Sequence, residues 1–62
     1  MKTVKKALTI FDCFTKNEHE LGVTEIATHL GFHKSTTHSL LSTLKEDGYV
    51  IYNPITRKYS LG

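Results

Sequence analysis

The stretch VTEIATHLGFHKSTTHSLLSTLKEDG, residues 23–48, contains two runs with helical spacing, separated by a glycine. Thr24 is the predicted N-cap of the first helix, and Gly31 is predicted to end that helix. The second helix is expected over about residues 33–47, with Gly48 in the C′ position. Two helices joined by a turn of three to four residues that contains Gly form a helix-turn-helix arrangement.

A further helix is predicted before this unit, over residues 3–15, because apolar residues recur there at three- and four-residue spacing. The apolar stripe consists of Val4, Ala7, Leu8, Phe11 and Phe14. Thr3 is the expected N-cap. Ile10 falls off the centre of the stripe and Cys13 lies beside it, so the apolar face is wider than one core contact needs. We expect the excess to serve a partner helix. The polar residues 16–20 are interpreted as a loop.

Two short strands are predicted after the helix-turn-helix unit. Residues 49–52 are β-branched and aromatic, and residues 58–61 alternate in polarity. Residues 53–57 have the proline and Asx chemistry of a hairpin turn. Residues 21–23 are too short for an independent strand but can pair at the edge of a small sheet. The sequence thus predicts a mostly α domain with a small β wing: three helices and a two- or three-stranded antiparallel sheet.

Chain length leaves room for a single small domain, residues 1–62, and excludes a multidomain enzyme. A domain of this size buries only about 60% of the surface of its unfolded chain, so marginal stability is expected. One Cys cannot form an internal disulfide. Support from dimerisation, or from a longer chain of which this domain is a part, is therefore expected.

Composition is that of a folded chain, with 39% hydrophobic and 23% charged residues. Eight Lys and Arg against six Asp and Glu give a net charge of +2, too small to decide for or against nucleic acid. No run approaches the ~18 apolar residues of a membrane span, and the first residues lead into no apolar signal-peptide core. A cytoplasmic protein without a membrane partner is expected.

The helix predicted over residues 33–47 has two different faces when it is wound at about 100° per residue. Its apolar side carries Thr37, Leu40, Leu41 and Leu44. The opposite side carries Ser35, His38, Ser39, Ser42 and Glu46. Hydroxyl residues have lower helix propensity than Ala or Leu, by a few tenths of a kcal/mol each. Small hydroxyls let a helix approach a surface closely and donate to phosphates or base edges.

Exposed hydroxyls on a helix more often serve only solubility, but the neighbouring elements favour DNA binding here. A short helix and a tight turn precede the hydroxyl-rich helix, and a hairpin with basic residues near its tip follows it. The predicted DNA contacts are Lys34, Ser35, Thr36, His38, Ser39, Ser42, Arg57 and Lys58. Lys34, Arg57 and Lys58 are assigned to phosphates, and the others to bases.

The chain resembles the winged helix-turn-helix DNA-binding domain of the isocitrate lyase regulator (IclR) family of bacterial transcription factors. The resemblance covers nearly all of the sequence. It rests on VKKAL (residues 4–8), VTEIA (23–27), KSTTH (34–38), DGYV (47–50) and TRKYSLG (56–62). It implies sequence-specific binding of double-stranded DNA for transcriptional regulation, with residues 33–47 in the major groove and the wing, about 49–61, on the backbone or minor groove.

Two positions depart from the family pattern, which commonly has Pro at position 33 and Arg at position 39. His33 and Ser39 stand there in this chain. The family's base preference therefore does not carry over at Ser39. The resemblance also implies a larger effector-binding domain after Gly62, so the chain is expected to be an excised domain or to work without a ligand sensor. An effector ligand is expected only if such a domain exists.

Homodimerisation through the first helix is predicted from Ile10, Cys13 and the marginal core. A dimer is expected to prefer an inverted-repeat operator, whose half-site spacing follows the two-fold axis of the protein. A different class of function stays open, because winged helices also serve as protein-interaction modules without DNA binding. Glu46 and Asp47, near the end of the hydroxyl-rich helix, keep this alternative in view.

Neither catalysis nor a cofactor is predicted. No Ser-His-acid set and no Gly-rich phosphate loop is indicated, and the acidic residues are scattered. Four histidines invite a metal hypothesis, but Gly31 interrupts the helix that would align His29 with His33. Tyr49, Tyr52 and Tyr59 are interpreted as packing residues rather than base-stacking ones.

Overall fold

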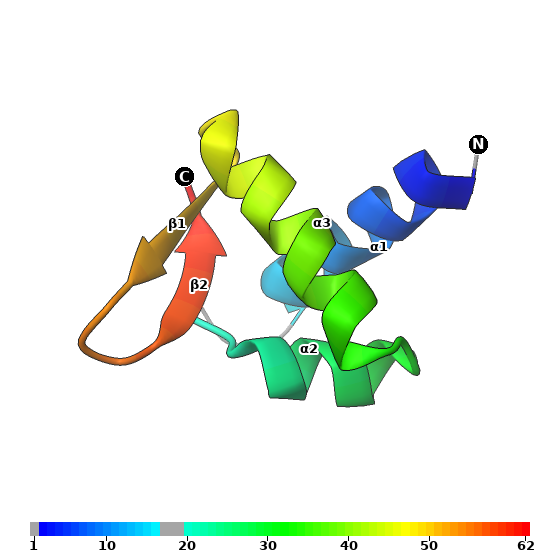
Figure 1. Ribbon diagram of the computed structural model, residues 1–62, viewed down its shortest axis with the longest axis horizontal. Coiled ribbons are helices and arrows are strands. Elements are labelled where there is room, and N and C mark those ends of the chain that lie inside the picture. The colour runs from blue at the N-terminus through cyan, green and yellow to red at the C-terminus, as the bar shows by residue number, and fades with distance from the viewer. Residues whose placement is uncertain (1, 17–19) are drawn as a thin grey trace.

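A computed structural model describes residues 2–16 and 20–62, with the side chains of residues 4–16 and 20–62 (Figure 1). Its elements are α1 (Lys2–Lys16), α2 (Val23–Leu30), α3 (Lys34–Glu46), β1 (Val50–Asn53) and β2 (Lys58–Leu61). The predicted three helices and small antiparallel sheet are confirmed. Residues 17–19 of the predicted first loop lie outside the described part.

Two glycines end the helices of the helix-turn-helix unit as predicted. Gly31 has φ 71° and follows α2, and Gly48 has φ 83° and follows the end of α3. Left-handed backbone of this kind is adopted most easily by glycine, which has no Cβ to clash with the carbonyl oxygen. His33 is the N-cap of α3, so the predicted turn between the two helices spans residues 31–33.

The predicted N-caps of the first two helices are wrong. α1 already includes Lys2, so Thr3 lies inside the helix. The N-cap of α2 is Gly22, which places Thr24 in the first turn. The reason is Glu25, whose Oε1 accepts the backbone N–H of Gly22 at 3.0 Å. That hydrogen bond is the carboxylate half of a capping box and starts the helix at Val23 rather than after Thr24.

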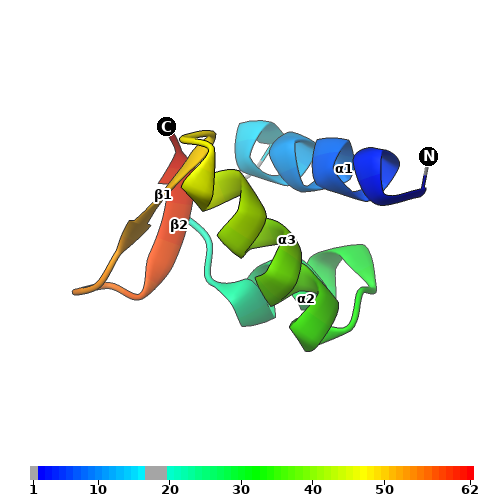
Figure 2. The ribbon, with the colours of Figure 1, turned by 45° about the horizontal axis from the view of Figure 1, so that its top comes forward.

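One hydrophobic core joins all three helices to the hairpin. Its buried members are Ile10, Cys13, Phe14, Leu21, Ile26, Leu41, Val50 and Tyr59. Figure 2 shows α1 beside α3, with the hairpin at the C-terminal end of α1. Thr37 is the buried polar residue of α3, and its hydroxyl donates to the His33 carbonyl oxygen at 3.0 Å. Its hydrogen bond is therefore satisfied within the helix.

The face of α1 that packs into the core only partly matches the predicted stripe: Phe14 is buried and Phe11 packs against the core. Ile10 is fully buried and Cys13 is 4% exposed, so both belong to the core rather than to an excess face. Val4 and Leu8 of the predicted stripe are 52% and 58% exposed. Apolar residues cover more than half of the circumference of α1, and contact with α2 and β2 selects the side centred near Ile10.

The wing is a two-stranded hairpin in which Val50 pairs with Leu61 and Tyr52 with Tyr59. The expected pairing of residues 21–23 is limited to Leu21, which exchanges two 2.8 Å backbone hydrogen bonds with Tyr59. This bridge ties the start of α2 to the wing. Among the described residues, no helix has the length and hydropathy needed to cross a membrane.

Candidate nucleic-acid interface

Burial of one side of α3 turns its hydroxyl-rich side outward. Thr37 and Leu41 have no exposed surface. Ser35, His38 and Ser39 on the opposite side are exposed, as the helical periodicity predicted. Thr36 and Ser42 are partly exposed. The core side of α3 therefore fixes the direction in which the candidate contact residues project.

One flank of α3 faces a groove of about 830 Å³ between this helix, the first turn of α2 and the wing. Lys34, His38, Ser42 and Lys45 line it from α3, at intervals of about one helical turn. Arg57 lines the groove from the wing. The structure thus brings together four of the predicted contact residues and adds a further lysine.

The remaining contact residues of α3 lie on its other flank. Ser35, Thr36 and Ser39 line a smaller hollow of about 300 Å³ together with Lys6 of α1. The Lys6 ammonium lies 5.4 Å from the ring centroid of Phe32, so a cation–π contact holds it between α1 and the start of α3. The candidate site is consequently a broad face with two hollows and not a single cluster.

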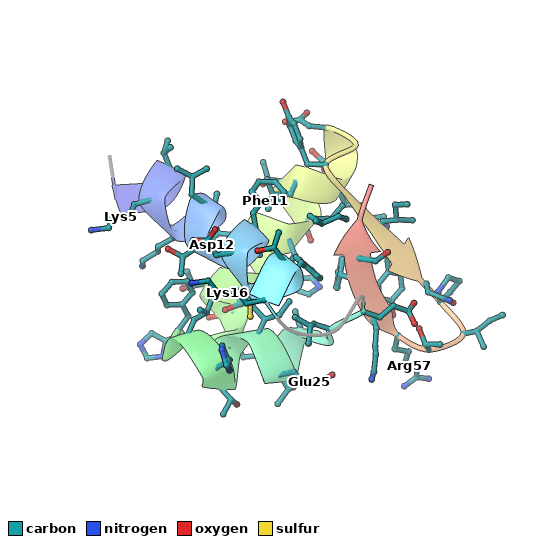
Figure 3. The ribbon with its side chains drawn as sticks, turned by 180° about the vertical axis from the view of Figure 1, so that it is seen from behind. Lys5, Phe11, Asp12, Lys16, Glu25 and Arg57 are labelled. Carbon is teal, nitrogen blue, oxygen red and sulfur yellow. The ribbon has the colours of Figure 1, made fainter. Side chains whose placement is uncertain are left out.

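The two basic residues predicted near the wing tip have different surroundings. Arg57 is exposed and ends the turn, with φ 59°. Lys58 is the first residue of β2, and its Nζ lies 3.6 Å from Oε1 of Glu25. Figure 3, seen from behind, shows Glu25 on α2 and Arg57 at the end of the wing. The Lys58 ammonium is thus paired to α2, whereas the Arg57 guanidinium borders the groove.

Lys45 is a groove residue that the sequence reading missed. Its Nζ lies 5.5 Å from the ring centroid of Tyr52. Lys45 follows Lys34 by eleven residues, which is about three helical turns, so the spacing alone places both on one stripe. The basic residues of the groove therefore extend over nearly the full length of α3, and Glu25 and Glu46 also line it.

Two of the three tyrosines that were predicted to pack, Tyr52 and Tyr59, do so. The rings of Tyr52 and Tyr59 are 4.9 Å apart, and Tyr59 is buried. Burial, and secondarily the nearby Tyr52 phenol, raises the pKa of the Tyr59 hydroxyl above its ordinary value of 10.0. Tyr49 is more open, with its ring in edge contact with Phe11 at 6.1 Å. Within the described ranges, no three His, Cys, Asp or Glu residues form a group suited to a metal ion.

Comparison with known proteins identifies the family. The family model described as the IclR helix-turn-helix domain matches residues 3–54. The HTH-type transcriptional regulator XynR of Escherichia coli K12 is 45% identical over all 62 residues. The glycerol operon regulatory protein of Streptomyces coelicolor is 31% identical over the same length. The chain spans about a quarter of the length of these relatives, 25% and 24%.

Solved structures of IclR regulators have the same fold. The regulator from Alicyclobacillus acidocaldarius superimposes with a TM-score of 0.95 at 33% identity, over 100% of this chain and 25% of the other. The regulator from Brucella abortus gives a TM-score of 0.92 at 33% identity, over 98% of this chain and 23% of the other. With its matching sequence and winged fold, the chain belongs to the IclR helix-turn-helix domain family, a family of transcriptional regulators and not of enzymes.

Proposed function

We propose that this domain binds double-stranded DNA sequence-specifically and thereby regulates transcription. The observation that carries the proposal is the basic groove between α3 and the wing, which adjoins the exposed hydroxyl face of α3. α3 enters the major groove, where Ser35, Ser39 and His38 face base edges. The membership of the chain in a regulator family supports this assignment.

The sugar–phosphate strand beside the occupied major groove runs between α3 and the wing. Lys34 and Lys45 meet this strand from α3, and Arg57 meets it from the wing. Thr36 contacts the duplex from the opposite flank of α3, and Ser42 contacts it from within the groove. Lys58 adds positive charge near the same DNA strand, although this charge is partly offset by its ion pair with Glu25. The ion pair also links the wing to α2.

The proposed active form is a homodimer that binds an inverted-repeat operator. Val4 and Leu8, four residues apart on α1, leave about half of their surface exposed and form an apolar stripe outside the core. A second copy of the stripe would cover it through a two-fold axis. The proposed place of action is the cytoplasm, where bacterial DNA is found.

The proposal is tested by fluorescence anisotropy of the 62-residue chain with a labelled generic duplex across a salt series. Log affinity is expected to decline steeply with log salt, because each neutralised phosphate releases counterions. Replacing Lys34 and Arg57 together by Ala is expected to flatten the slope by about 2. The matched control replaces Lys5 and Lys16, two exposed lysines of α1 (Figure 3), and removes the same charge.

If both double variants flatten the salt dependence of binding equally, the proposed surface is contradicted, because the loss of net charge alone would then explain the change. No binding at low salt, from a chain whose circular dichroism shows it to be folded, would contradict DNA binding altogether. Glu25 and Glu46 in the groove lining would then favour the protein-interaction alternative.

A further inference from the structure

His38 lies on the stripe of α3 that lines the groove between this helix and the wing. It is exposed, and it follows Lys34 and precedes Ser42 by about one helical turn each. Histidine is the side chain whose charge ordinarily changes between pH 5 and 8. Lysine and arginine keep their positive charge throughout this range. The charge that the groove presents to a ligand at His38 therefore depends on pH, whereas the charge of its other basic residues does not.

The charged groups that face His38 come from every element around the groove: Lys34, Lys45 and Glu46 from α3, Glu25 from α2, and Arg57 from the wing. The Glu25 carboxylate already pairs with a lysine ammonium of the wing at 3.6 Å. Glu46 follows His38 by eight residues, about 12 Å along the helix axis. Tyr52 and Tyr59 also line the groove, and phenols are neutral in this pH range. Among the described residues, neither carboxylate forms an ion pair with His38.

DNA supplies hydrogen-bond acceptors at this place. In the proposed complex, His38 lies between the base edges of the major groove and the phosphate strand that Lys34 and Arg57 contact. Phosphate oxygens, and the O6 and N7 atoms of guanine, accept hydrogen bonds and donate none. A protonated imidazole donates from both ring nitrogens, whereas a neutral one has a single N–H and one acceptor. The protonated form of His38 therefore gains more from contact with DNA than the neutral form.

We infer that His38 takes up a proton when the domain binds DNA, so that the affinity for DNA rises as the pH falls. The inference rests on the proposed function. The complex then holds this proton up to a higher pH than the free domain does, so the gain in affinity is full at the acidic end of the range and is lost as the pH rises. The domain thereby responds to pH through the DNA contact itself, without a separate ligand site.

Fluorescence anisotropy tests the inference, with the 62-residue chain and a labelled generic duplex at one low salt concentration. The wild type is expected to bind about fivefold more tightly at pH 5.5 than at pH 8.0. His38→Gln keeps a polar side chain that donates and accepts hydrogen bonds but takes up no proton in this range. This variant is expected to bind with nearly equal affinity at the two pH values.

A salt series at the two pH values identifies the acceptor that His38 meets. If the proton is shared with a phosphate, log affinity declines with log salt more steeply at pH 5.5, by up to about 1, because one more counterion is released. If the proton is donated to a guanine edge, the two slopes are equal. Both results support proton uptake at His38 and differ only in its partner on the DNA.

The matched control is His29→Gln. His29 is an exposed histidine in the last turn of α2, outside the groove lining. This variant is expected to keep the difference in affinity between the two pH values, and circular dichroism checks that each protein is folded at both.

Equal affinity of the wild type at pH 5.5 and pH 8.0 would overturn the inference. A His38→Gln variant that keeps the difference, or a His29→Gln variant that loses it, would do the same, because the proton would then be taken up elsewhere. Absence of binding at both pH values would instead overturn the proposed function, and this inference with it.

Discussion

Arg57 shows how one residue combines a backbone cost with a surface position. Its left-handed φ of 59° is a conformation that costs a residue with a Cβ roughly 1–2 kcal/mol relative to the right-handed form. Glycine avoids that cost but would bring no guanidinium to the edge of the groove. Stability and DNA binding therefore make opposite demands on this position.

Replacing Arg57 separates the two demands. Arg57→Gly is expected to be more stable than Arg57→Ala by about 1 kcal/mol, because only Gly relieves the left-handed strain. For a domain of this size the difference corresponds to about 4–8 °C in Tm. Both variants are expected to lose DNA affinity equally. Thermal denaturation followed by circular dichroism and anisotropy with one duplex measure the two effects, and equal Tm values would contradict the strain argument.

Among the elements, those ended by local signals are the ones that the sequence predicts best. Gly31 and Gly48 mark the ends of α2 and α3 because each position needs a conformation that glycine adopts with little cost. The buried face of α1 was predicted only in part: Phe14 is in the core, but Leu8 is exposed and Ile10 is buried in its place, since the sets around Leu8 and around Ile10 both have helical spacing. Only packing against α2 and β2 decides between them, and no local pattern contains that information.

Glu25 links two elements through one carboxylate oxygen. Its Oε1 accepts the Gly22 N–H at 3.0 Å, which caps α2, and lies 3.6 Å from the Lys58 ammonium of β2. The ion pair is about half exposed on both sides, so its contribution to stability is at most about 1 kcal/mol. The capping bond satisfies a backbone donor that α2 otherwise leaves unpaired.

Two substitutions at Glu25 distinguish these contributions. Glu25→Gln keeps an acceptor for Gly22 and loses the charge, so it is expected to cost only a few tenths of a kcal/mol. Glu25→Ala loses both interactions and is expected to cost about 1 kcal/mol. The free energy of unfolding in urea provides the measurement, and Glu46→Ala, an exposed change in the last turn of α3, is the control. Equal losses for Gln and Ala would mean that the ion pair and not the cap dominates.

On the scale of the whole molecule, the sequence predicts which side of α3 is exposed but not that its contact residues line two separate hollows. The outward direction of Ser35, His38 and Ser39 follows from the period of α3. Which contact residues of α3 face the wing and which face α1 depends on where the hairpin and α1 pack. Residues distant in sequence determine that packing. Lys45 is predictable from the sequence in the same way as the exposed side of α3, because it follows Lys34 by eleven residues and therefore lies on the same side of the helix.

The oligomeric state is also a property of the whole molecule, and the structure changes which residues are proposed to form the dimer interface. Ile10 and Cys13 are buried within one chain, so the exposed stripe of Val4 and Leu8 is the proposed interface.

Leu8→Glu, at a side chain 58% exposed, is expected to give a folded monomer where the wild type sediments as a dimer at high micromolar concentration. Lys5→Glu introduces the same residue on the same helix outside the stripe and is expected to remain dimeric. A monomeric wild type, or a dimer unaffected by Leu8→Glu, would contradict the interface. If Leu8→Glu gives a monomer, its affinity for a single half-site is expected to persist while its preference for an inverted repeat is lost, because that preference requires two linked recognition helices.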